Sequence, residues 1–144
     1  MATKRIFPEN IQLDQVNAAS EGTMLEHLGI ELTEIGDDYI VAKMPVDHRT
    51  KQPMGLLHGG ASVALAESLG SYGAFLTLDH AKQSAVGLEI NTNHIKSARD
   101  GFVYGKASPI HMGKSTHIWG IEIKNEQDQL VAVSRITMAI LEKK

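Results

Sequence analysis

The chain has 144 residues, a formal net charge of -3 and no cysteine. This length suits one domain with a substantial core, and the slightly acidic balance gives no basic footprint for binding nucleic acid. The lack of cysteine excludes disulfide scaffolds, cysteine nucleophiles and zinc sites that need thiolates.

The N-terminal segment has no apolar run after its basic pair, Lys4 and Arg5, so no signal peptide is predicted. The most apolar stretch, residues 57–78, is long enough to span a bilayer, but it contains a glutamate, a histidine, four glycines and three serines. These residues disfavour a transmembrane helix. We therefore expect a single cytoplasmic domain over residues 1–144 that binds no membrane.

The first half of the chain predicts short helices and a hairpin. Residues 10–27 form one or two short helices, because their apolar residues recur at helical spacing. Strands follow at 30–35 and 39–46, joined by the turn signal at 36–38. A polar, irregular loop over residues 47–55 then leads to the most apolar stretch.

That stretch predicts a long buried helix. Residues 57–78 contain one formally charged side chain, Glu67, among apolar, small and hydroxyl residues. A helix that is apolar nearly all round is usually buried, so we expect one that starts near His58 or Gly59 and ends before Asp79. Its many small residues indicate that other backbone packs close against it, because interior glycines otherwise cost about 1 kcal/mol each.

After the helix the apolar pattern changes to period two. It predicts four strands, at about 86–90, 102–107, 119–123 and 130–141. Short turns without helical crossovers make sequential strands antiparallel. The predicted fold class is therefore α+β, with one antiparallel sheet curved around one long central helix.

The central helix also carries the candidate chemistry. A carboxylate in a buried helix needs a reason, because burial without a partner costs several kcal/mol. Glu67 and Ser71 share one helix face, and the helix start at His58 and Gly59 presents unpaired N–H groups. Such N–H groups can stabilise negative charge on a carbonyl oxygen, and the carboxylate can attack or activate water. The set indicates acyl transfer to water.

Each of these residues also has an ordinary structural interpretation. A lone helical glutamate is usually solvated, a serine such as Ser71 is usually a small packing residue, and His58 can be a helix cap or a core residue. The chemical interpretation therefore depends on the whole set, and on the absence of any other charge around Glu67.

Other hydrolase chemistries fit less well. Ser62 lies in Gly-Ala-Ser-Val-Ala, which lacks the closing glycine of a nucleophile elbow. No two histidines have zincin spacing, so no metal site is predicted. The turn from Gly113 to Thr116 ends like a Walker A motif, but the first glycine is missing and a strand follows. We interpret it as a hairpin turn with the capacity to hold a phosphate.

The segment PVDHRTKQPMGLLHGGASVALAES resembles the hotdog-fold acyl-CoA thioesterases. The similar group includes the Glu-dependent 4-hydroxybenzoyl-CoA enzymes, the phenylacetate-pathway thioesterases and the 1,4-dihydroxy-2-naphthoyl-CoA hydrolases. The resemblance continues through GLEINTNHIKSARDG and SRITMAIL, and so covers nearly the whole chain. It implies a sheet wrapped around a long helix, and a homo-oligomer, expected to be a dimer of dimers, with active sites between two subunits.

The resemblance also implies residue roles. It makes Glu67 the catalytic nucleophile or general base, and Gly59 the backbone oxyanion donor. Gln52 and His58 would position the thioester, and the Ser71 hydroxyl would help to place water. We expect no cofactor and no metal. The resemblance assigns the CoA moiety of an acyl-CoA substrate to Gly87, His94, Ile95, Lys96, Ser97, His111, Met112, Gly113, Lys114, Ser115 and Thr116.

The leading functional hypothesis is hydrolysis of an aromatic acyl-CoA. The match around PVDHRTKQP favours 1,4-dihydroxy-2-naphthoyl-CoA in menaquinone biosynthesis. One alternative is a proofreading thioesterase that clears misacylated carrier protein in siderophore synthesis. Others are a non-catalytic acyl-CoA-binding module and a dehydratase-like relative. The dehydratase branch would use a histidine catalyst, so Glu67 argues against it.

Overall fold

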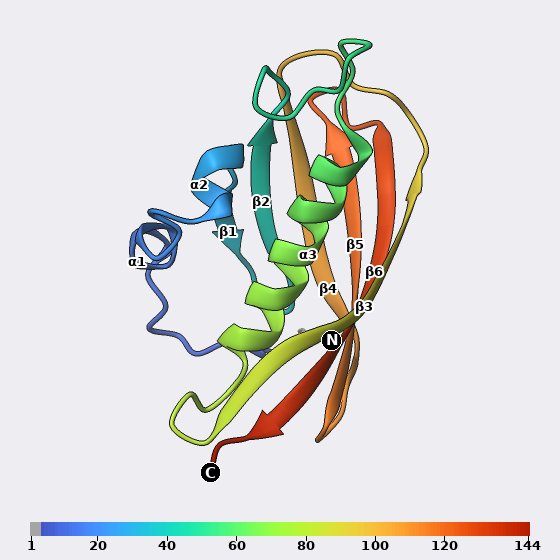
Figure 1. Ribbon diagram of the computed structural model, residues 1–144. Helices are drawn as coiled ribbons and strands as arrows, with labels where there is room; N and C mark the ends of the chain where they lie inside the picture. The colour runs from blue at the N-terminus through green and yellow to red at the C-terminus, as the bar shows by residue number, and fades with distance from the viewer. Residues whose placement is uncertain (1–3) are drawn as a thin grey trace.

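The computed structural model describes residues 4–144. In chain order its elements are α1 (Leu13–Ala18), α2 (Met24–Leu28), β1 (Glu31–Ile35), β2 (Ile40–Pro45), α3 (Gly59–Leu76), β3 (Gln83–His94), β4 (Phe102–Met112), β5 (Thr116–Asn125) and β6 (Leu130–Glu142). All six strands pair antiparallel in one sheet, in the order β1-β2-β4-β5-β6-β3. The sheet curves around α3 (Figure 1), which confirms the predicted α+β fold.

The strands extend further than the period-two pattern predicted. We expected a strand over residues 102–107, whereas β4 continues to Met112. The register with β5 shifts between Pro109 and His111. A bulge of this kind inserts an extra residue and interrupts the alternation of side chains. Pairing therefore continues where the sequence pattern stops.

Close packing between α3 and the strands explains the small residues of the helix. A Cβ atom on Gly73 would lie 2.7 Å from the Trp119 ring, and one on Gly70 would overlap Ile136. We expected neighbouring backbone at these positions, but the structure fills them with strand side chains. Trp119 is fully buried, and truncating such a residue to alanine costs about 3–5 kcal/mol.

The prediction that α3 is buried on nearly every face is wrong for the single chain. One face packs against the sheet through fully buried residues such as Leu65 and Leu69. The opposite stripe leaves Glu67 and Phe75 exposed. Because both faces are apolar or small, the pattern cannot distinguish a face that the sheet covers from one that is open.

The two edges of the sheet differ. The β1 edge is short, and the Asn17 side chain occupies it: its amide donates to the Leu32 carbonyl at 2.9 Å and accepts the Leu32 N–H at 2.8 Å. The β3 edge is long and open, with Val86 and Leu88 exposed at 46% and 63%. A long apolar edge invites pairing with another strand. Within residues 4–144, none of the helices has the length and apolarity needed to cross a membrane.

A buried histidine makes the stability of this fold depend on pH. His117 of β5 is buried, and its Nδ1 accepts the Trp119 indole N–H at 3.3 Å. Burial, and secondarily the charge of His111, lower the pKa of His117 below its ordinary value of 6.5. The unfolded chain therefore binds this proton more readily than the folded one.

We expect the stability contribution of neutral His117 to be complete above about pH 6.5, the ordinary histidine pKa, and to be lost as the pH falls below it. The urea midpoint of the wild type should be lower at pH 5 than at pH 7. A His117→Leu variant should lose less between the same two pH values. Equal losses in both proteins would show that another group controls the effect.

Candidate active site

The start of α3 presents a backbone donor. His58 caps the helix: its Nδ1 accepts the Gly60 N–H at 2.8 Å, and its own N–H donates to the Thr50 carbonyl at 2.8 Å. Gly59 is the first residue of the helix, so its N–H has no partner within the helix. An unpaired amide at the positive end of a helix dipole can bind a carbonyl oxygen.

The loop before α3 carries Gln52, whose N–H donates to the Leu56 carbonyl at 2.8 Å. At the base of the loop, Arg49 Nη2 donates to Asp47 at 2.7 Å and Thr50 Oγ1 donates to the Pro45 carbonyl at 2.7 Å. The Gln52 side chain accepts the Met54 N–H within the same loop. The hydrogen bonds from Arg49 lower the pKa of Asp47 to about 2. The ion pair therefore persists above about pH 4, and its contribution is lost as the pH falls from the ordinary value of 3.8 toward 2.

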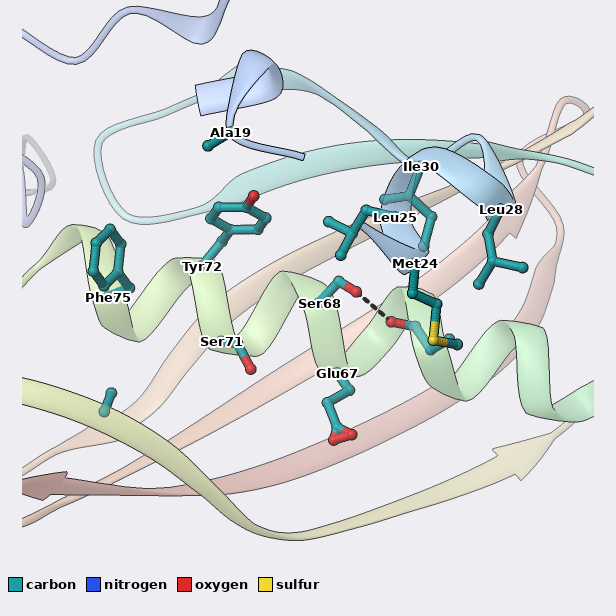
Figure 2. Close-up of a pocket in the computed structure, with 12 residues that line it drawn as sticks. Ala19, Met24, Leu25, Leu28, Ile30, Glu67, Ser68, Ser71, Tyr72 and Phe75 are labelled. Atoms are coloured by element: carbon teal, nitrogen blue, oxygen red, sulfur yellow. Dashed lines mark hydrogen bonds between the residues drawn. The ribbon is translucent and has the colours of Figure 1, made fainter. Parts of the chain in front are cut away.

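The middle of α3 carries the candidate carboxylate. In Figure 2, Glu67 and Ser71 project from the helix toward β3, whereas Ser68 and Tyr72 project toward the N-terminal helices. Glu67 is exposed, and none of the ion pairs among residues 4–144 includes it. A carboxylate with this open approach is available to a substrate.

A cavity of about 560 Å³ opens along the same stripe of α3. Its wall is mainly apolar, and it is formed in part by Met24, Leu25 and Leu28 of α2 (Figure 2). Tyr72 also lines the cavity, and its hydroxyl lies 3.1 Å from Ser20 Oγ. The sequence indicated the apolar side chains of α2 but gave no signal that they form a pocket wall beside Glu67.

Glu67 and the Gly59 amide are far apart within one chain. Eight residues separate them along the helix, which corresponds to roughly 12 Å at the α-helical rise. The Glu67 side chain projects sideways toward β3 rather than along the axis toward Gly59 (Figure 2). One carbonyl group cannot contact both, because an oxyanion donor and an attacking atom each lie only about 3–3.5 Å from the reacting atoms.

The first group of predicted CoA residues, His94–Ser97, lies near the start of α3. A Cβ atom on Gly59 would be 3.0 Å from the His94 ring. The N–H groups of Ile95 and Lys96 both donate to the Val131 carbonyl, at 2.8 and 3.2 Å. Ile95, Lys96 and Ser97 are all exposed, so this loop presents free side chains beside the His58 end of α3.

The second group lies at the other end of the sheet. It is the β4–β5 turn with the strand residues that flank it, closed by the Gly113 N–H, which donates to the Thr116 carbonyl at 2.8 Å. The predicted residues in this segment are His111, Met112, Gly113, Lys114, Ser115 and Thr116. His94 pairs with Ala132 and Thr116 pairs with Ala139 on β6, so roughly 23 Å of strand separates the two groups. Gly87 lies on exposed β3 opposite Met138, which is level with the Thr116 end. One chain therefore does not bring the predicted CoA residues together.

Residues 4–144 contain no group of three or more histidine, aspartate or glutamate side chains placed to hold a metal ion. Along its length, α3 instead presents a carboxylate, hydroxyls, the backbone amides of its first turn and an apolar cavity.

Comparison with known proteins identifies the family. Residues 54–132 match the model of the thioesterase superfamily. The 1,4-dihydroxy-2-naphthoyl-CoA hydrolase of Escherichia coli is 52% identical over 94% of this chain and 99% of its own. The proofreading thioesterase EntH of Cronobacter sakazakii is 48% identical over 94% of this chain and 98% of its own.

Solved structures support the same family. A thioesterase from Haemophilus influenzae superposes with a TM-score of 0.92 at 42% identity, over 95% of both chains. A mutant thioesterase from Pseudomonas aeruginosa superposes with a TM-score of 0.94 at 40% identity, over 96% of this chain and 99% of its own. The chain therefore belongs to the thioesterase superfamily and is a thioester hydrolase with the hotdog fold.

Proposed function

We propose that the protein hydrolyses aromatic acyl-CoA thioesters to the free acid and CoA, with 1,4-dihydroxy-2-naphthoyl-CoA of menaquinone biosynthesis as the leading substrate. The observation that carries the proposal is the unpaired Glu67 carboxylate, which opens onto a mainly apolar cavity beside Ser71. The 52% identical relative named for that substrate supports the choice of acyl group.

In the proposed reaction the thioester oxygen accepts the Gly59 N–H, and the amide stabilises the negative charge that develops there. The Glu67 carboxylate either attacks the carbonyl carbon or removes a proton from water, and Ser71 orients that water. In the first route the C–S bond breaks as an anhydride forms between Glu67 and the acyl group, and water then cleaves this anhydride. In the second route water adds to the acyl carbon as the C–S bond breaks. Both routes consume one water and deliver one proton to the CoA sulfur. Gln52 and His58 hold the thioester at the helix start.

Because Gly59 and Glu67 are far apart along α3, the proposed active site is shared by two copies of the chain. Since roughly 12 Å of helix rise is too long for one carbonyl to contact both, Glu67 of one copy acts with Gly59 of the partner. The open β3 edge is the proposed contact, because the β1 edge is already occupied by Asn17.

A two-fold pairing of β3 edges would also unite the CoA residues. Two copies of one strand run antiparallel when the two-fold axis is perpendicular to the strand, and this is the arrangement that we propose. The His94 end of one copy then lies beside the Thr116 end of its partner, which is two strands, or roughly 10 Å, in from the edge. The proposed CoA site combines the Lys96 loop of one copy with the Lys114 turn of the other.

Lysine variants test this placement. Lys96→Ala and Lys114→Ala should each raise KM for CoA esters and leave kcat nearly unchanged, because the phosphate contacts are shared by the ground and transition states. The wild-type KM should rise with ionic strength, since contacts near the surface are screened by salt, and the variants should respond less. Equal losses on a truncated thioester that lacks the nucleotide would contradict the placement.

Thiol release from a panel of CoA esters tests the function itself. The panel contains hydroxylated aromatic, plain aromatic and aliphatic acyl groups of similar size, each also presented on an acyl carrier protein. Highest kcat/KM for the aromatic CoA esters is expected. Preference for the carrier-bound acyl groups would support proofreading, the function named for the 48% identical relative. Absence of thiol release from every ester would overturn the proposal in favour of a binding module.

A further inference from the structure

Two histidine rings occupy the places where side chains would project from the first two helical glycines of α3. A Cβ atom on Gly60 would lie 3.0 Å from the ring of His58, whose Nδ1 accepts the Gly60 N–H. A Cβ atom on Gly59 would lie 3.0 Å from both Cε1 and Nε2 of His94. Both glycines are therefore in close contact with an imidazole edge.

The two contacts differ in origin. His58 is the cap of the same helix, so its contact with Gly60 is local. His94 is the last residue of β3, and reaches Gly59 from a separate element of the fold. The end of β3 is anchored in turn, because the next residue, Ile95, donates its N–H to the Val131 carbonyl at 2.8 Å. His94 thus links the sheet to the helix start.

We infer that His94 is a positioning residue that holds the Gly59 amide in place for the thioester oxygen, and that it does not read the CoA nucleotide. The inference rests on the proposed function, because it gives Gly59 the role of oxyanion donor. The imidazole edge lies against the first residue of α3, where a glycine leaves the ring undisturbed. An alanine there pushes the ring by a few tenths of an ångström.

Steady-state kinetics separate positioning from nucleotide binding. His94→Ala should lower kcat about tenfold, because a small misplacement of a catalytic group has effects of this order, and should leave KM for CoA esters within about twofold. His94→Phe keeps a ring against Gly59 and should retain kcat within about threefold of the wild type. A raised KM with unchanged kcat in His94→Ala would overturn the inference, as would equal kcat losses in the alanine and phenylalanine variants.

A double-mutant cycle tests the contact directly. Gly59→Ala should lower kcat in the wild-type background and have almost no further effect in a His94→Ala background, because the ring that it displaces is gone. Gly60→Ala is the matched control: its Cβ meets His58 at the same 3.0 Å, so its effect should be the same in both backgrounds. An effect of Gly59→Ala that is equal in both backgrounds would contradict the contact.

Urea unfolding of the same six proteins gives a readout that does not need turnover. The free energies of unfolding should show coupling between positions 59 and 94 and none between 60 and 94. If this coupling is present but no CoA ester is hydrolysed, the proposed function fails and the packing stands. If the esters are hydrolysed without the coupling, the inference about His94 fails alone.

Discussion

Replacing Glu67 with glutamine is expected to lower kcat by about 10²-fold or more, the loss that follows removal of a positioned acid–base group. The substitution keeps the shape of the side chain and removes its charge. Glu67 is exposed and makes no ion pair among the described residues. Its loss should therefore leave the fold intact, and the thermal midpoint should stay within a few degrees of the wild type.

The matched control is Glu122→Gln, which changes an exposed glutamate on the face of the sheet away from α3. Thiol release under single-turnover conditions should be slow in the Glu67 variant and normal in the control. Near-normal turnover after Glu67→Gln would make this residue structural, and the proposed mechanism would be wrong.

Charging the β3 edge should abolish activity by separating the subunits. Val86 and Leu88 are the exposed apolar residues of this edge, and lysine side chains on an edge strand oppose pairing. The Val86→Lys/Leu88→Lys protein should have a monomer mass in light scattering. Its kcat should fall about 10²–10³-fold, as on loss of an oxyanion donor, because no partner supplies Gly59 to Glu67.

The control for this experiment is Thr33→Lys on the opposite edge of the sheet, where Asn17 already occupies the backbone of β1. It should keep both the mass and the activity of the wild type. A wild-type protein that is already a fully active monomer at micromolar concentration would contradict the proposed interface.

The sequence predicted the fold well because its apolar periods are unambiguous. Trp119, Ile121 and Ile123 alternate as a strand should, and all are buried. The change from helical spacing to period two marked the order of elements. The length of β4 was underestimated because the bulge after Pro109 breaks the alternation of inward and outward side chains. The open face of α3 was missed because, apart from Glu67, its residues are as apolar or small as those of the buried face.

The site was predictable only in part, because it depends on contacts between distant positions. Glu67 was conspicuous as the single charge in an apolar helix. By contrast, the contact of His94 with Gly59 joins the end of β3 to the start of α3 and leaves no periodic signal. The two CoA segments follow one another closely in sequence, yet the antiparallel strands carry them to opposite ends of the sheet.

Activity in mixed oligomers tests the shared site most directly. Gly59→Pro removes the proposed oxyanion donor while suiting the first helical position, and the extended backbone of His58, with ψ 130°, is compatible with a following proline. The mixing partner is Glu67→Gln, and each variant alone should be nearly inactive.

When the two variants are unfolded together and refolded in equal amounts, half of the dimers are mixed, and each mixed dimer contains one complete site. Thiol release should then reach about a quarter of the wild-type rate. If the rate of thiol release by the mixture stays at the mean of the rates of the two variants alone, Gly59 and Glu67 act within one chain, and the shared site is contradicted.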